Sequence, residues 1–283
     1  MIRCGSKSLP VRCSERWPRA IARVERGLSL VELLVSIGVI GVLLSLAVPA
    51  LRNARRAAGE AVSLSNLSQL ALTVGSWSES HSDLFPHLRP DTTYHLGYPT
   101  GARPAAALTG ALVPFAHLLW PAVIRDEFPM EQHAHAWISP GRGLALPQQE
   151  EEWETHGALA QFIPSYELTA SFNASPRLWT AEGAATSGID RAALLAVPRT
   201  TMVAHPGAKV MFFDSNMFFD RRPVRSWANG LPDRPTPMLF ADGHANSLLP
   251  SAARQPFLAP LVPDEVAGYP LHNTPRGVLG ADY

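Results

Sequence analysis

The sequence predicts an α+β protein, in which one long N-terminal helix packs on a small antiparallel β-sheet domain with Pro-rich loops. Pro49 is the only proline between residues 28 and 80. From Pro86 onward, 23 prolines occur in 198 residues, more than twice the usual share of ~5 per cent. Such a density excludes long helices and favours short strands. Asp242-Gly243, between two strand-like runs, is typical of a tight hairpin turn.

Residues 33–51 are uncharged throughout and have the length of a membrane span. Glu32 precedes this stretch and Arg52 follows it. As a helix it would be roughly 28 Å long, about the thickness of a bilayer's hydrocarbon core. We therefore expect residues 28–51 to form a transmembrane helix. Glu32 is then an ionisable group near lipid, which usually has a partner and a function.

The helix is expected to continue beyond the membrane as an amphipathic segment, residues 52–80. Its apolar side should bury against the globular domain, with Trp77 in the core. Apolar residues recur there at spacings of three or four, at Leu64, Leu67, Ala71, Val74 and Trp77.

The two ends of the chain differ in charge although the formal net charge is +0. Residues 1–27 hold seven basic and two acidic residues, and the remainder holds 17 basic and 22 acidic ones. The positive-inside rule keeps residues 1–27 cytoplasmic and places the body on the other side. A mildly acidic body argues against nucleic-acid binding. Both cysteines, Cys4 and Cys13, lie in residues 1–27, so the body has no disulfide framework.

The residues around the start of the apolar stretch resemble the N-terminus of type IV pilins and type II secretion pseudopilins. In that family a basic leader ends in Gly, and a prepilin peptidase cuts after it. The mature chain begins with a methylated residue, has Glu in fifth place, and often has Pro near the membrane end of its helix. Gly27, Glu32 and Pro49 fall at these spacings, with Leu28 where the family usually has Phe. The resemblance implies cleavage after Gly27 and a new, methylated N-terminus at Leu28.

The resemblance further implies a single-pass protein of the inner (cytoplasmic) membrane, with its leader cytoplasmic and its C-terminal domain periplasmic. It would be a subunit of a type II secretion pseudopilus or a type IV pilus-like fibre. Implied partners are the prepilin peptidase, other pilins or pseudopilins, an inner-membrane assembly platform and membrane lipid. Glu32 and Pro49 would serve assembly. Cleavage creates an α-ammonium at Leu28, and pairing it with Glu32 of the same or a neighbouring chain would satisfy both charges. Pro49 favours a kink or local loss of helix.

Alternatives remain open at this stage. Glu32 could snorkel at a membrane interface, or residues 1–50 could form a secretory signal cut near Ala47-Val48-Pro49-Ala50. The protein could also be a membrane-anchored extracytoplasmic binding module that does not polymerise, or an anchored periplasmic hydrolase. The sequence holds no nucleophile-elbow, P-loop, dinucleotide-binding or zinc-peptidase motif. We therefore expect no enzyme.

The globular domain is expected over residues 81–250, followed by a Pro-rich C-terminal tail, residues 251–283, that is partly disordered. Residues 216–237 are expected to be a loop. Strands are predicted at Ala134–Ile138, Lys209–Asp214, Met238–Ala241 and His244–Leu249.

The hairpin sequence Phe240-Ala241-Asp242-Gly243-His244 is similar to one found near the C-terminus of large pseudopilin-like proteins of planctomycetes and verrucomicrobia. Those proteins often have a His ten residues before the Asp, where this chain has Pro232. We interpret Asp242, Gly243 and His244 as a turn motif rather than a metal site, because Asp-Gly is what a tight turn with positive φ requires.

Two sets of residues suggest metal chemistry. His133 and His135 would share one face of the predicted strand, a geometry that zinc can use, but spacing identifies no third ligand. Asp214, Asn216 and Asp220 could offer oxygen ligands to calcium, although the Gly and the terminal Glu of an EF-hand are missing. Calcium is thus a hypothesis, and no other cofactor is expected.

Overall fold

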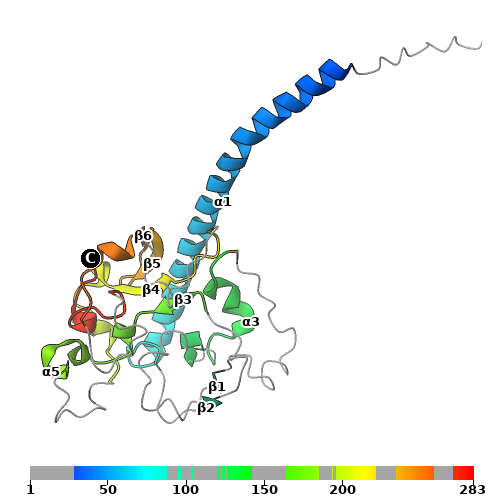
Figure 1. The fold of residues 1–283 in the computed structure, drawn as a ribbon. Helices are drawn as coiled ribbons and strands as arrows, with labels where there is room; N and C mark the ends of the chain where they lie inside the picture. Colours follow the sequence, from blue (N-terminus) through cyan, green and yellow to red (C-terminus); the bar gives the residue numbers. More distant parts are fainter. Residues whose placement is uncertain are drawn as a thin grey trace, which may run out of the picture. The chain divides into compact units, whose positions relative to one another are not determined.

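The computed structural model describes residues 29–87, 95–96, 103–104, 120–121, 123–124, 126–141, 164–184, 193, 196–220, 234–257 and 270–283 (Figure 1). Contacts within the chain divide it into two units, Met1–Ala50 and Leu51–Tyr283. The predicted cleavage site, Gly27 and Leu28, lies outside the described residues, as does Pro232.

Helix α1 runs without a break from Leu30 to Ser80, in agreement with the predicted long N-terminal helix. Pro49 lies inside it. Its second half buries one face, as the spacing of apolar residues predicted: Leu67, Leu70, Val74 and Trp77 are at most 2 per cent exposed. These four side chains form one core cluster with residues of the β-sheet. Trp77 is therefore a core residue.

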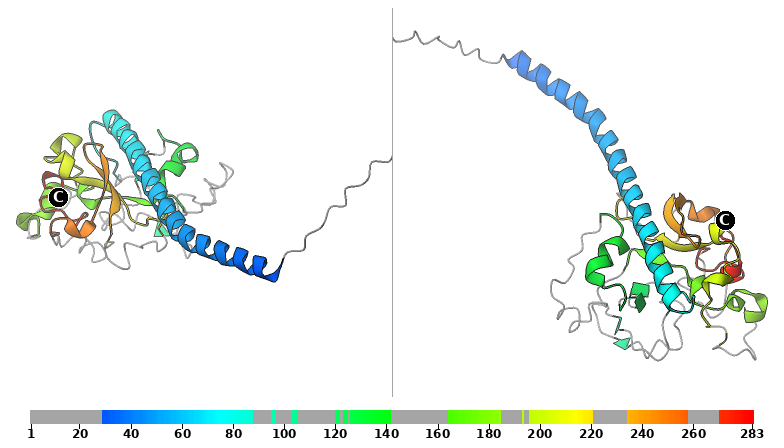
Figure 2. Two further views of the ribbon diagram at one scale, coloured as in Figure 1. Left: turned by 90° about the horizontal axis from the view of Figure 1, so that it is seen from above. Right: turned by 180° about the vertical axis from the view of Figure 1, so that it is seen from behind.

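The sheet of the globular unit has four antiparallel strands in the order β3-β4-β5-β6. Its strands are labelled in Figure 1, and Figure 2 gives two further views of the ribbon. β4 and β5 are buried at every position, which fits their place in the middle of the sheet. The predictions for Lys209–Asp214, Met238–Ala241 and His244–Leu249 are confirmed to within two residues. The strands are β3 (Tyr166–Leu168), β4 (Val210–Asp214), β5 (Thr236–Phe240) and β6 (Ala245–Leu248).

Short elements make up the rest of the described fold. A separate pair of strands, β1 (His95–Leu96) and β2 (Arg103–Pro104), is antiparallel. The short α-helices are α3 (Met130–His133) and α5 (Ala181–Ala184). The 3-10 turns are η2 (Ala134–Trp137), η4 (Ala170–Phe172), η5 (Pro176–Trp179), η6 (Thr200–Met202), η7 (Pro206–Ala208), η8 (Pro250–Ala252) and η9 (Gly277–Leu279).

The predicted strand at Ala134–Ile138 is wrong, because these residues continue helix α3 as the 3-10 turn η2. In the structure, Ala134 and Trp137 are both buried, and their spacing of three is the period of a 3-10 helix.

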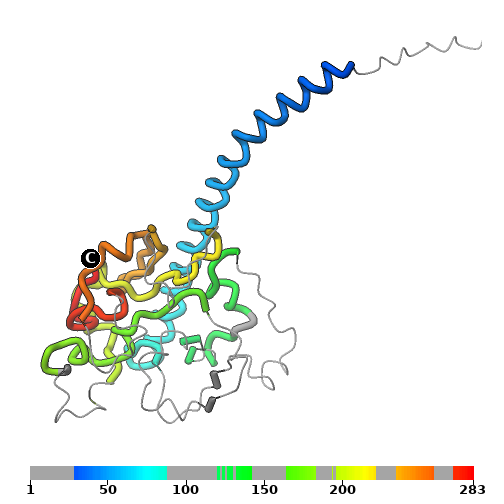
Figure 3. Tube along the Cα trace, in the orientation of Figure 1, coloured from blue at the N-terminus to red at the C-terminus, as the bar shows by residue number. Residues whose placement is uncertain are grey.

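The prediction of a disordered tail is also wrong for residues 270–283, which Figure 3 traces in red. Leu271 and Val278 are fully buried. The backbone N–H of Asp282 donates to the carbonyl of Ala208, and the carbonyl of Asp282 accepts from the backbone N–H of Arg254. The end of the chain is thus part of the folded body.

The loop after β4 lies directly on the second half of α1. A Cβ atom at Gly59 would lie 2.4 Å from Cβ of Phe219, so the close approach of this loop requires glycine. Gly59 therefore has a packing role.

Candidate functional site in helix α1

Residues 33–51, the apolar segment, expose their hydrophobic side chains in the structure. Its large hydrophobic residues are all between 40 and 70 per cent exposed, although such side chains are normally buried in a water-soluble chain. Among the described residues, α1 is the one helix long and apolar enough to cross a membrane. By length and composition, the apolar segment fits a membrane anchor or a signal anchor.

Glu32 forms a reciprocal capping box with Ser29 at the start of α1. The backbone N–H of Ser29 donates to Oε2 of Glu32 at 2.9 Å, and the backbone N–H of Glu32 donates to Oγ of Ser29 at 3.2 Å. This arrangement gives hydrogen-bond partners to two backbone N–H groups that have none within the helix. It also holds the carboxylate at the positive end of the helix dipole. We had not predicted it, although Ser-x-x-Glu is its sequence signal.

The capping box leaves Glu32 able to bind a cation as well. An ionised carboxylate offers about four acceptor sites, and the cap uses one of them. In a chain beginning at Leu28, the α-ammonium would be one residue before Ser29, whose N–H already contacts the carboxylate. Glu32 therefore keeps acceptor sites for a further cationic partner.

The hydroxyl groups within the apolar segment are satisfied by the helix itself. Ser36 donates to the carbonyl of Glu32, and Ser45 donates to that of Val42, each at 2.7 Å. Hydroxyls bonded in this way can face lipid or a neighbouring helix at little cost. Glu32 is the only charged residue of α1 before Arg52.

Asp242, Gly243 and His244 form the tight turn between β5 and β6, as interpreted from the sequence. Gly243 has φ of +90°, and the backbone N–H of Phe240 donates to the carbonyl of His244 at 2.9 Å. Oδ1 of Asp242 accepts from the backbone N–H of His244 and lies 2.6 Å from its Nδ1. The imidazole stacks on the Phe240 ring, with centroids 4.3 Å apart. The contacts of the turn therefore explain the positions of the Asp242 and His244 side chains.

Gly243→Ala is expected to destabilise the globular unit by about 1 kcal/mol or more, because a side chain strains a backbone with φ of +90°. His244→Ala removes a half-exposed ring that stacks on Phe240 and contacts Asp242, but it strains no backbone, so it should cost no more than Gly243→Ala. Urea unfolding followed by tryptophan fluorescence would measure both. Equal stability of Gly243→Ala and the wild type would contradict the role assigned to the turn.

The calcium candidates Asp214, Asn216 and Asp220 have protein partners. The carboxylate of buried Asp214 accepts from Oγ of Ser63 and from the backbone N–H of Met217, both at 2.8 Å, and of Asn216 at 3.2 Å. Burial raises the pKa of Asp214, and these hydrogen bonds oppose that effect. Asp214 therefore links the loop after β4 to helix α1.

Asp220 faces arginines: Arg234 at 2.6 Å and Arg56 at 3.8 Å. His133 and His135 lie in α3 and η2, so the predicted shared strand face does not exist. In the described part of the chain, no group of three His, Cys, Asp or Glu side chains is placed to hold a metal ion. We make no proposal for a metal site from these residues.

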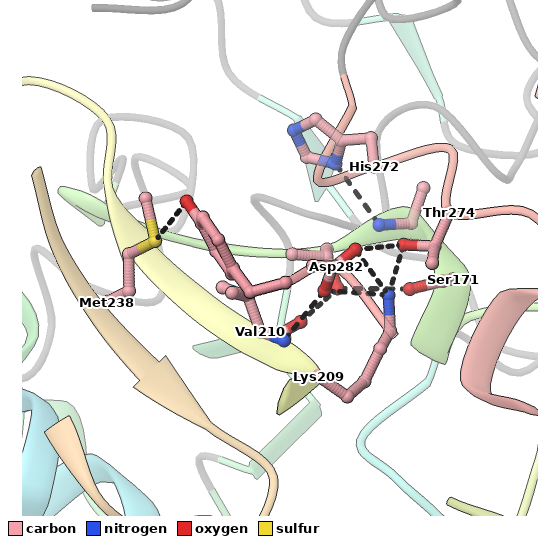
Figure 4. A network of polar contacts seen from close by, with 10 residues as sticks. Ser171, Lys209, Val210, Met238, His272, Thr274 and Asp282 are labelled. Atoms are coloured by element: carbon pink, nitrogen blue, oxygen red, sulfur yellow. Dashed lines mark hydrogen bonds and ion pairs between the residues drawn. The ribbon is translucent and has the colours of Figure 1, made fainter. Parts of the chain in front are cut away.

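A second cluster, which sequence reasoning missed, is buried at the end of the chain (Figure 4). We call Lys209, Thr274 and Asp282 the C-terminal network. Lys209 is 0 per cent exposed, and its Nζ lies 3.1 and 3.3 Å from the two carboxylate oxygens of Asp282. No spacing signal could have found this pair, because 73 residues separate the partners.

Comparison of the chain with protein-family models, with curated proteins and with solved structures found no match.

Proposed function

We propose that the chain is a prepilin-like subunit, or pseudopilin, that is processed after Gly27. It then assembles through α1 into a type II secretion pseudopilus or a type IV pilus-like fibre. The observation that carries the proposal is the exposed apolar segment, directly preceded by the carboxylate of Glu32, which is fixed at the helix start. The basic leader and Gly27 precede this segment in the sequence.

The architecture supports the proposal. The second half of α1 packs against a small antiparallel sheet, whereas the side chains of the apolar segment are exposed. A helix that is apolar all round is suited to lipid and equally to a bundle of like helices. Gly38 and Gly41 add small surfaces, with open space where a side chain would stand, and such surfaces let helices approach closely.

In the proposed pathway, the chain enters the inner membrane with residues 1–27 in the cytoplasm and the globular unit outside it. The prepilin peptidase removes the leader and exposes the α-ammonium of Leu28, which is methylated. The assembly platform then transfers the subunit from lipid into a fibre, where Glu32 pairs with the N-terminus of a neighbour. No catalytic role is proposed for the globular unit.

Mechanical shearing of cells tests the proposal. Cells that express the chain with a cognate assembly system should release it in the sheared fibre fraction. Gly27→Val should remain in the membrane at full length, because the residue before the cleaved bond is altered. Leu28→Phe, which restores the residue usual in the family, is the matched control and should assemble. A wild-type chain that is absent from the sheared fraction would contradict the pilus-like surface fibre, and one that also forms no cross-links to other pilins within the envelope would contradict the fibre role altogether.

A second candidate function is a membrane-anchored extracytoplasmic binding module that does not polymerise. A cavity of about 670 Å³ favours it, lined by the second half of α1, by residues 200–206 and by the Asp242-Gly243 turn. This volume lies in the range of small-molecule sites. The copy number per cell separates the two functions. The copy number of a fibre subunit should follow that of the other pilins, whereas the copy number of a binding module should not.

A further inference from the structure

Lys209 of the C-terminal network is unusual because lysine is rare in this sequence. The chain has 24 Lys and Arg residues, and Lys209 is the only lysine after Lys7. Of the Lys and Arg positions after Lys7, every one except Lys209 is arginine, which is not deprotonated in proteins. Lysine can lose its proton and then act as a nucleophile. The one lysine of the body is thus fully buried against a carboxylate.

The contacts around Asp282 suit reaction with this amine (Figure 4). Nζ of Lys209 donates to Oγ1 of Thr274, which in turn donates to Oδ1 of Asp282. The hydroxyl therefore connects the two groups and can pass a proton between them. The other oxygen, Oδ2, accepts from the backbone N–H of Val210 at 2.7 Å. A donor so placed stabilises negative charge that develops on that oxygen.

The surroundings of Lys209 disfavour its charged form. Lys209 and Asp282 are 0 and 1 per cent exposed, and Nζ lies 5.7 Å from the centre of the Phe172 ring. Burial lowers the pKa of Lys209, and the charge of Asp282 opposes this effect. Two ions in such a place lose their hydration, so proton transfer to an amine and a carboxylic acid relieves a cost. Neighbours held in contact also react far faster than free molecules.

We propose that Lys209 and Asp282 condense to an intramolecular amide that fastens the penultimate residue to the start of β4. A proton first passes from Nζ through Thr274 to Oδ1. Nζ then attacks Cγ, and negative charge develops on Oδ2 beside the Val210 N–H. The bond from Cγ to Oδ1 breaks, Oδ1 takes a second proton from Nζ and leaves as water. The balance is one amine and one carboxylic acid giving one amide and one water, without a further reactant.

The cross-link would take the place that disulfides have in many exported proteins. Residues 28–283 contain no cysteine. The link closes a loop from Lys209 to Asp282 that includes β5, β6 and the tail segment with η9. A closed loop has less freedom in the unfolded state, so it resists unfolding.

Intact mass under denaturing conditions tests the amide on the full chain. The wild type should be lighter than its sequence by the mass of one water, and fragmentation should yield a branched peptide joining Lys209 to Asp282. After leader removal, an amine-reactive label should find no lysine in the denatured wild type. Lys209→Arg is the matched control: it keeps the charge, cannot condense, and should have its full sequence mass.

Thr274→Val should lower the fraction of cross-linked chains, because it removes the bridging hydroxyl but neither reacting group. All of these masses are read from denatured protein, so a folding defect in a variant leaves the wild-type result valid. A wild-type chain at full sequence mass with a labelled Lys209 would overturn the proposal. Loss of water that persists in Lys209→Arg would overturn it as well.

Discussion

Lys209→Met is expected to lower the free energy of unfolding of the globular unit by about 3–5 kcal/mol, because it leaves the Asp282 carboxylate buried without its cation. In a chain that carries the proposed amide, the same substitution removes the cross-link instead of the ion pair, and it should again lower the free energy of unfolding. Four largely buried tryptophans, Trp77, Trp120, Trp137 and Trp179, report unfolding by fluorescence. Urea titration of the purified full chain in detergent gives the midpoint and the slope.

The double variant Lys209→Met/Asp282→Leu is the control for the charge argument. It removes both ions and fills their space with apolar atoms, so it should be more stable than either single variant. If Lys209→Met unfolds at the same urea concentration as the wild type, the C-terminal network does not hold the tail, and our account of the tail is wrong.

Glu32→Leu is expected to be cleaved after Gly27 but to enter fibres at least tenfold less than the wild type. The substitution removes the proposed partner of the neighbouring N-terminal ammonium. Leucine is well tolerated in a membrane helix, so insertion should be unaffected. Quantification of the chain in the membrane and sheared-fibre fractions gives the ratio. Glu79→Leu, at an exposed glutamate in the second half of α1, is the matched control and should assemble.

Glu32→Gln separates the two contacts of this side chain. Glutamine preserves the capping box with Ser29 but carries no charge. If the charge pair drives assembly, Glu32→Gln should fail as Glu32→Leu does. Normal incorporation of Glu32→Gln together with failure of Glu32→Leu would assign Glu32 to helix capping instead.

Sequence reasoning predicted the parts of the fold that depend on local pattern. The apolar and amphipathic halves of α1 have clear periodicity, and α1 ends at Ser80, as predicted. The β5–β6 hairpin follows from the positive φ that Gly243 supplies. The error at Ala134–Ile138 arose because five residues are too few to separate a period of two from a period of three.

Features that depend on distant residues could not be predicted. Lys209 and Asp282 meet because the tail returns to β4, and nothing near either residue signals the other. The donors around Asp214 come from α1 and from the loop after β4, so its carboxylate looked available in the sequence. The assembly role of Glu32 stays a prediction, and its hydrogen bond to Ser29 was overlooked although Ser-x-x-Glu signals it.

The central claim is that the chain is processed as a prepilin, and the N-terminal sequence of the protein extracted from membranes tests it most directly. A mature chain that begins at Leu28, with Glu32 in fifth place, is the predicted result. A chain that begins near Leu51 would identify a secretory signal and a product without the apolar segment. Either that start or an intact chain beginning at Met1 in cells with an active prepilin peptidase would contradict the account.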